Sequence, residues 1–173
     1  MKILRLVAAS AAVLLSLVAG VQAQTTLRIG LAEDPDILDP TLARTYVGRI
    51  VFASFCDKLF DIDEKLNIVP QLALSHETSA DGKEMTIKLR PGVKFHDGEP
   101  LDAEAVKFSL DRHVTMPTSF RKPELAQLDH VDVVDPLTVK LALKTPFSPL
   151  IAQLTDRAGM MVSPKAAKTM RPT

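Results

Sequence analysis

One histidine and four carboxylates gather at residues 96–104, within the stretch LRPGVKFHDGEPLDAEAVKFSLDR, which spans residues 89–112. These five residues are His96, Asp97, Glu99, Asp102 and Glu104. Such a group could supply a general base, an acid that orients a nucleophile–base pair, or ligands for a metal ion. Each of these chemistries demands particular residue types at a particular spacing, so the sequence can be tested against each of them.

The sequence does not indicate covalent catalysis. A nucleophilic site needs a serine or cysteine beside a histidine and an acid, and the chain has neither a G-x-S-x-G elbow nor a glycine-rich phosphate loop. Cys56 is the only cysteine, so it cannot form an internal disulfide. Its neighbours Phe52 and Phe55 predict a buried, unreactive thiol. We therefore expect no catalytic residues and no enzymatic activity.

Metal binding is not indicated either. The four histidines are His76, His96, His113 and His130. They are scattered and lack the spacing of a motif such as H-E-x-x-H, and His96 is typical of a turn. Asp61 and Asp63 begin like a calcium loop, but Leu66 occupies the position that requires glycine. We expect neither a metal ion nor a cofactor.

Composition limits the classes of partner. The 173 residues include 21 basic and 21 acidic side chains, and no basic stripe is present that could contact nucleic acid phosphates. Aromatic residues are few, with one tyrosine, seven phenylalanines and no tryptophan, so stacking surfaces for bases are scarce. An apolar content of 46% is ordinary for a globular chain, and the length suits one domain or part of a larger one.

The first 23 residues have the pattern of a secretory signal peptide. Lys2 and Arg5 precede an uncharged apolar run over residues 6–21, and Val21-Gln22-Ala23 places small residues at a cleavage site. The run of about 16 residues is shorter than the roughly 20 needed to span a bilayer. No cysteine follows it to accept a lipid. We expect cleavage after Ala23, so that the mature domain comprises residues 24–173.

Periodicity predicts the elements that must position the polar residues. Alternating apolar and polar residues predict strands at residues 26–31, 75–78, 84–90, 130–134 and 138–144, with a last short strand at 159–162. Helical spacing predicts helices at residues 45–56, 103–114 and 149–154, and another begins at Pro164. Strands with one polar face are typical of antiparallel sheets covered on one side. The sequence therefore predicts an α+β fold.

The predicted core lies between one strand and one helix. The residues expected in it are Met85, Ile87, Leu89, Val106, Leu110 and Val114. We expect Leu110 to be buried against the strand of residues 84–90. Asp102 and Glu104 then belong to the first turn of the helix, where Asp102 caps the amide groups and the helix dipole favours negative charge.

The stretch that holds these residues also carries a family resemblance. The segments RPGVKFHDG and LDAEAVKFSLDR resemble the signature of the peptide, dipeptide, oligopeptide and nickel class of extracellular solute-binding proteins, which serve ATP-binding-cassette importers as solute-binding protein family 5. Ala105 replaces the usual aspartate. Similar motifs occur at residues 38–40, 68–73, 146–150 and 162–164. The resemblance covers nearly all of residues 25–170.

The resemblance implies a fold of the periplasmic-binding-protein type II kind, in the class with an extra α+β subdomain. Residues 24–173 would then form the start of the first lobe and most of that subdomain, with a mixed or antiparallel sheet and short helices. Chains of the family continue for several hundred residues more. We therefore expect a truncated gene product that lacks the second lobe.

The same resemblance implies a ligand site in the loop after the first strand. The candidate ligand-binding residues are Glu33, Asp34, Pro35, Asp36 and Tyr46. Carboxylate and backbone groups there could bind a cationic or amide group of a solute. The alternative is that these acids only cap and turn the loop, and Tyr46 is a weaker candidate than the acids.

The implied function is that of a monomeric periplasmic receptor that passes a small solute to an inner-membrane ABC permease. Dipeptides, oligopeptides, glutathione-like peptides, nickel complexes and opine-like compounds are all carried by this scaffold, so the solute is not identified. The alternative function is a vestigial secreted fragment, or an interaction module that binds no ligand.

Overall fold

The computed structural model describes residues 26–169, which fall into two compact units, one ending at Leu31 and the other beginning at Ala32. Residues 26–31 form no regular secondary structure, and Leu27 and Ile29 are largely exposed. The predicted strand at 26–31 is therefore wrong, because a strand needs backbone partners and no described strand pairs with it. The predicted signal peptide lies outside the described residues. Among the described helices, none has the length and apolar character needed to cross a membrane.

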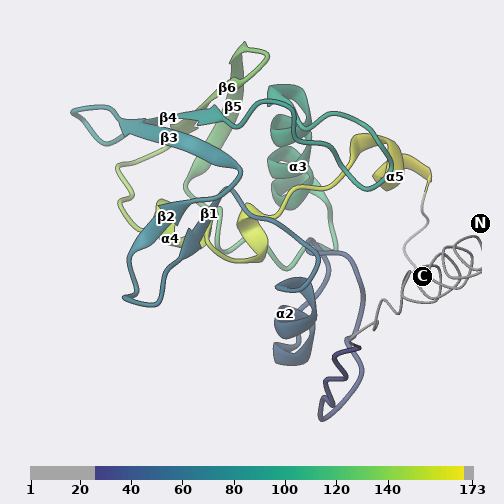
Figure 1. The fold of residues 1–173 in the computed structure, drawn as a ribbon. Coiled ribbons are helices and arrows are strands. Elements are labelled where there is room, and N and C mark those ends of the chain that lie inside the picture. Colours follow the sequence, from purple (N-terminus) through teal and green to yellow (C-terminus); the bar gives the residue numbers. More distant parts are fainter. Residues whose placement is uncertain (1–25, 170–173) are drawn as a thin grey trace, which may run out of the picture. The chain divides into compact units, whose positions relative to one another are not determined.

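The second unit is built on a four-stranded antiparallel sheet (Figure 1). Its strands, in spatial order, are β3 (Ala73–Thr78), β4 (Glu84–Leu89), β6 (Thr138–Leu143) and β5 (Leu128–Asp135). Met85, Ile87 and Leu89 are buried on one face of β4, whereas Glu84 and Lys88 are exposed on the other. The alternation in the sequence correctly predicted these strands.

Local polar contacts shape the turns between strands. Gly82 adopts φ +69° in the hairpin that joins β3 to β4. The side chain of Asp81 accepts hydrogen bonds from the Ser79 hydroxyl and from the amide of Lys83, which stabilises the turn. The Asp-Gly pair had predicted this hairpin.

A second, smaller sheet was not predicted. It consists of β1 (Phe60–Ile62) and β2 (Ile68–Pro70), which pair antiparallel. In the turn between them the Asp63 carboxylate accepts from the amides of Lys65 and Asn67, while Leu66 adopts a left-handed φ of 65°. Of the two aspartates that resemble the start of a calcium loop, Asp61 therefore lies in β1 and Asp63 in the hairpin turn.

Helix α3 (Ala103–Thr115) packs on one face of the four-stranded sheet, mainly against β5 and β6 (Figure 1). Asp102 caps it, as predicted, by accepting a hydrogen bond of 2.9 Å from the amide of Ala105. Val106 and Leu110 are fully buried, and Leu110 belongs to the same core cluster as the buried side chains of β4. Strands and short helices around one core confirm the predicted α+β class.

The remaining helices are short. They are α2 (Tyr46–Phe52), α4 (Leu150–Gln153), the 3₁₀ helix η1 (Arg157–Gly159) and α5 (Pro164–Thr169). Helix α2 ends four residues before its predicted limit, in turns that follow Phe52. The predicted strand at 159–162 is wrong: Gly159 lies in η1, and Met160 forms only a single bridge with Lys58. A side chain at Gly159 would collide with the carbonyl of Leu154, so the backbone here packs against α4 rather than extending.

Two positions that are far apart in the sequence, 58 and 160, are neighbours in the fold. Lys58 and Met160 form an antiparallel bridge, and the amide of Leu59 donates to the carbonyl of Gly159 at 2.9 Å. Both sheets and α3 therefore lie in the stretch of chain between these two neighbouring positions.

Candidate functional site

Asp36 is the most constrained residue of the candidate ligand loop. Its carboxylate accepts hydrogen bonds of 2.9 Å from the amide of Arg44 and from the hydroxyl of Thr45. Slight burial opposes ionisation of Asp36, but these hydrogen bonds outweigh it and hold the pKa of the carboxyl below its usual value. Asp36 therefore ties the loop to the start of α2.

The other candidate residues are open to solvent. Glu33 and Asp34 are exposed, Pro35 is half-buried, and Tyr46 at the first position of α2 is 72% exposed. Thr45, which bonds Asp36, directly precedes Tyr46 and caps α2 by accepting from the amide of Gly48 at 3.1 Å. The structure therefore brings the Asp36 end of the loop beside the Tyr46 end of the helix.

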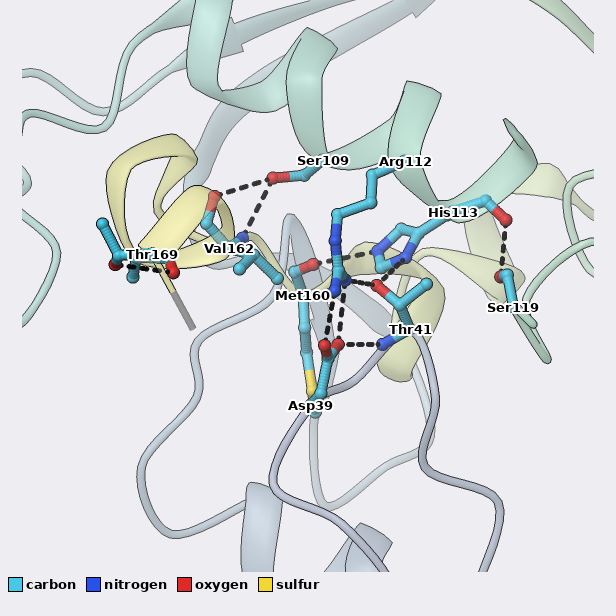
Figure 2. A network of polar contacts seen from close by, with 10 residues as sticks. Asp39, Thr41, Ser109, Arg112, His113, Ser119, Met160, Val162 and Thr169 are labelled. Atoms are coloured by element: carbon cyan, nitrogen blue, oxygen red, sulfur yellow. Dashed lines mark hydrogen bonds and ion pairs between the residues drawn. The ribbon is translucent and has the colours of Figure 1, made fainter. Parts of the chain in front are cut away.

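An ion pair holds the segment that joins this loop to α2. Arg112 of α3 donates to both carboxylate oxygens of Asp39, at 2.9 and 2.5 Å, and the amide of Thr41 donates to the same carboxylate (Figure 2). Burial opposes ionisation of Asp39, but Arg112 and Thr41 outweigh it, so the pKa of this carboxyl lies below its usual value. A planar guanidinium with two parallel bonds fixes orientation as well as distance.

A buried histidine continues the network. The Thr41 hydroxyl lies 2.9 Å from Nδ1 of His113, and Nε2 of His113 lies 3.2 Å from the carbonyl of Met160 (Figure 2). Arg112 also donates to the Thr41 hydroxyl, so that hydroxyl donates onward to His113. The neutral imidazole with its proton on Nε2 satisfies both contacts. Complete burial penalises the cation and lowers the pKa of His113 to about 4, and the charge of Arg112 acts in the same direction.

Two further arginines are buried around the same segment. Arg121 is 3% exposed and donates to the carbonyl of Ala43 at 3.0 Å and to Glu124 at 2.7 Å. Arg157 of η1 is 6% exposed and donates to the carbonyl of Thr45 at 3.3 Å. The segment that precedes α2 is therefore surrounded by cationic side chains from three parts of the unit.

The carboxylates of the stretch that spans residues 89–112 do not converge. Asp97 accepts from the hydroxyl of Ser163 at 2.6 Å, Glu99 pairs with Lys165 at 3.0 Å, and Asp102 caps α3. Within residues 26–169 no group of three or more histidine, cysteine or acidic side chains could hold a metal ion. The contacts of these acids join loops and helices.

A hollow of about 280 Å³ lies beside Cys56, lined by residues 53–57 and 93–96 together with Leu72, Leu101 and Met161. Burial, with the nearby charge of Asp57, raises the pKa of the Cys56 thiol to about 11. The residue is half-buried rather than buried as predicted, and its thiol is protonated at neutral pH, as expected of an unreactive cysteine.

The arginine contacts were not predicted. The Leu-Asp-Pro motif drew attention to Asp39 as a family feature, but its partner Arg112 lies 73 positions later. The only available signal was that Arg112 and His113 fall near the end of a predicted helix.

Comparisons with known proteins place these features in a family. The family model "Bacterial extracellular solute-binding proteins, family 5 Middle" matches residues 67–172. The glutathione-binding protein GsiB of Pectobacterium atrosepticum is 42% identical over 130 residues, which are 75% of this chain and 25% of that protein. GsiB of Escherichia coli strain K12 is 38% identical over the same shares. The chain spans about a quarter of the length of the curated relatives it matches.

Similar solved structures are also binding proteins. The PBP AgaA of A. tumefacien R10 in complex with agropinic acid is 33% identical, with a TM-score of 0.73 over 78% of this chain and 28% of that one. NikA of Brucella suis in complex with Fe(III)-EDTA is 30% identical, with a TM-score of 0.67 over 74% of this chain and 26% of that one. These neighbours are type II periplasmic binding proteins, which confirms the predicted fold class, and the relatives are binding proteins, not enzymes. The chain therefore belongs to family 5 of the bacterial extracellular solute-binding proteins.

Proposed function

We propose that this chain forms part of the receptor of an ABC importer, which binds a peptide or related small solute and delivers it to an inner-membrane permease. The observation that carries the proposal is the 42% identity with a glutathione-binding protein over three quarters of the chain. Glutathione and other short peptides are accordingly the first candidate solutes. A nickel complex or an opine-like compound is a less direct inference, since it rests on more distant structural neighbours.

The charge of the candidate loop suits one end of such a solute. Glu33, Asp34 and Asp36 lie in a stretch without lysine or arginine between Arg28 and Arg44. A peptide carries a terminal ammonium group, and carboxylates with backbone carbonyls are the partners that such a cation needs. We assign Glu33 and Asp34 to direct contact with that ammonium group, with Pro35 and Tyr46 beside it. Asp36 holds the loop in place through the contacts described above.

The proposal includes a location and a domain assignment. Removal of the predicted leader after Ala23 would release into the periplasm a monomeric protein that begins at Gln24. Within it, the four-stranded sheet with α3 corresponds to the extra subdomain, and the segment up to α2 corresponds to the start of the first lobe. A structural neighbour that shares this fold is named as a periplasmic murein tripeptide binding protein.

Isothermal titration calorimetry of the protein purified from its own cells tests the proposal. We expect a micromolar or tighter dissociation constant for glutathione or another short peptide. Acetylation of the amine of that peptide, or Glu33→Gln in the protein, should weaken binding about tenfold, since a hydrogen bond to a charged group contributes roughly 1.5 kcal/mol. Glu64→Gln, in the exposed turn between β1 and β2, is the matched control and should leave affinity unchanged. Absence of binding to every peptide tried would contradict the proposal.

A further inference from the structure

Three arginines contact the segment of residues 39–45 at every second residue. Arg112 binds Asp39 and Thr41, Arg121 binds the carbonyl of Ala43, and Arg157 binds the carbonyl of Thr45. They come from α3, from the loop after α3 and from η1, so three separate parts of the unit contact one short segment, which begins with a turn. The amide of Phe120 adds a hydrogen bond of 3.0 Å to the carbonyl of Thr41.

Burial makes these arginines an unusual way to stabilise a loop. Arg121 and Arg157 are 3% and 6% exposed, and within the described residues the Nε atom of each lacks a hydrogen-bond partner. The free energy lost in desolvating a guanidinium offsets much of the free energy gained from its ion pairs, and apolar side chains of similar volume often stabilise a core better. A buried guanidinium does fix geometry, because its donors point in set directions within one plane. The three arginines thus fix the position of the segment more effectively than they raise the free energy of unfolding.

The contacts continue from this segment to the candidate loop. Thr45 accepts from Arg157 through its carbonyl and donates through its hydroxyl to Asp36. The amide of Arg44 donates to the other oxygen of the same carboxylate. The space is tight, since a side-chain carbon at Gly48 would lie 3.1 Å from the Asp36 carboxylate. A shift of Thr45 must therefore move both Asp36 and the first turn of α2.

We propose that Arg112, Arg121 and Arg157 are positioning residues, which set the place of the solute-binding loop of residues 33–36 relative to the four-stranded sheet. The inference rests on the proposed function, because it assigns to these arginines the task of presenting Glu33 and Asp34 to the solute. A role limited to stability would leave the position of the loop in the folded protein unchanged when an arginine is replaced.

Tyr46 provides a reporter for this position. It is the only tyrosine among the 173 residues and lies directly after Thr45. In the protein made from its own gene and labelled with 3-fluorotyrosine, Tyr46→Phe identifies the fluorine resonance of Tyr46. Arg157→Met should shift or broaden that resonance and weaken binding of the peptide ligand about fivefold or more, as expected for loss of one hydrogen bond. Arg157→Lys, which keeps a donor for the Thr45 carbonyl, should restore most of both properties.

Lys107→Met is the matched control, because Lys107 is a cation of α3 that donates to the carbonyl of Val131 in β5 and not to the segment. It should change neither the Tyr46 resonance nor the affinity. If Arg157→Met does not fold, Arg121→Lys takes its place, since a lysine cannot reach both Glu124 and the Ala43 carbonyl. A folded variant with the wild-type resonance, or with wild-type affinity, overturns the inference. A wild-type protein that binds no peptide contradicts the proposed function instead, and the resonance still decides whether the arginines place the segment.

Discussion

Acid should destabilise the fold through His113 before it affects most carboxylates. The pKa of His113 is lowered to about 4 in the folded protein, against an ordinary value of 6.5. The unfolded chain therefore takes up the proton first, so stability is complete above pH 6.5 and falls as the pH drops towards 4. Linkage gives a loss of about 2 kcal/mol at pH 5 and about 3 kcal/mol at pH 4 from this residue alone.

The structure explains why the imidazole resists protonation. Nδ1 of His113 accepts from the Thr41 hydroxyl, so a proton on Nδ1 would remove the acceptor of that hydroxyl hydrogen. Arg112 and Arg121 oppose the cation, and only Asp39 and the carbonyl of Met160 favour it. The pKa of Asp39 is itself below its ordinary value of 3.8, so its contribution is lost only at more acidic pH.

Urea unfolding followed by far-ultraviolet circular dichroism measures this effect, since a chain with one tyrosine and no tryptophan offers little fluorescence. Between pH 7 and pH 5 the urea midpoint should fall by about 1 M on account of His113, with a slope near 2 kcal/mol per molar urea. In His113→Gln the amide retains one donor and one acceptor but does not titrate, so its midpoint should fall less.

Exposed His130 is the control. The pKa of His130 is raised, first through the hydrogen bond to Asp129 and also by Asp132. The protonated side chain therefore stabilises the folded state at low pH. His130→Gln lacks this contribution and should lose slightly more stability in acid than the wild type. Parallel losses in the wild type and His113→Gln would refute the reasoning. A pKa near 6.5 for His113, measured by nuclear magnetic resonance in the folded protein, would refute it as well.

Four further expectations concern the core, the thiol, export and binding. Leu110→Ala should lower the free energy of unfolding by about 3 kcal/mol, and Leu110→Asp by more, because the side chain is fully buried. Leu74→Ala, at a site 53% exposed, should cost less than about 0.5 kcal/mol. Equal urea midpoints for the Leu110 and Leu74 variants would show that the assigned helix face is wrong. Cys56, with a pKa of about 11, should react far more slowly with iodoacetamide at pH 7.5 than free cysteine does, and a rate like that of the free thiol would contradict its burial. Sequencing the exported protein should find Gln24 at the amino terminus, and a retained Met1 in the membrane fraction would exclude cleavage. The isolated polypeptide 24–173 should bind peptides more weakly than micromolar in calorimetry, because a few solvated hydrogen bonds of about 1 kcal/mol each do not offset the several kcal/mol lost on association; tighter binding would show that it holds a complete site.

Strands, turns and the main helix could be predicted because their signals are local. Residues 84–89 alternate strictly, Asp-Gly marks the first hairpin, and Asp102 has the residue type and position of a helix cap. The strands β1 and β2 escaped prediction because each is three residues long, too short for a period of two to be recognised. Residues 26–31 have the alternation of a strand, but alternation cannot supply the partner that a strand requires.

The site was harder to predict because its contacts are long-range. An acidic loop with prolines was evident, but the engagement of Asp36 depends on Arg44 and Thr45, whose positions the arginines of α3, η1 and the loop after α3 determine. Similarly, residues 159–162 are apolar because they pass beneath α3, where Val162 exchanges hydrogen bonds with the Ser109 hydroxyl (Figure 2). A short apolar run does not distinguish that position from a strand within a sheet.

The bridge between Lys58 and Met160 makes the stretch between them a removable module. Entry and exit points that lie side by side are the condition under which a domain can be inserted into another chain, or deleted from it, without separating the flanking backbone. A short glycine-containing turn that joins position 58 to position 160 would preserve the path on both sides, and a surface loop of an unrelated host could receive residues 59–159 in the same way. The stretch thus has the connectivity of an inserted domain, and a replacement for it would have to supply the contacts that Arg112, Arg121 and Arg157 make with the segment of residues 39–45.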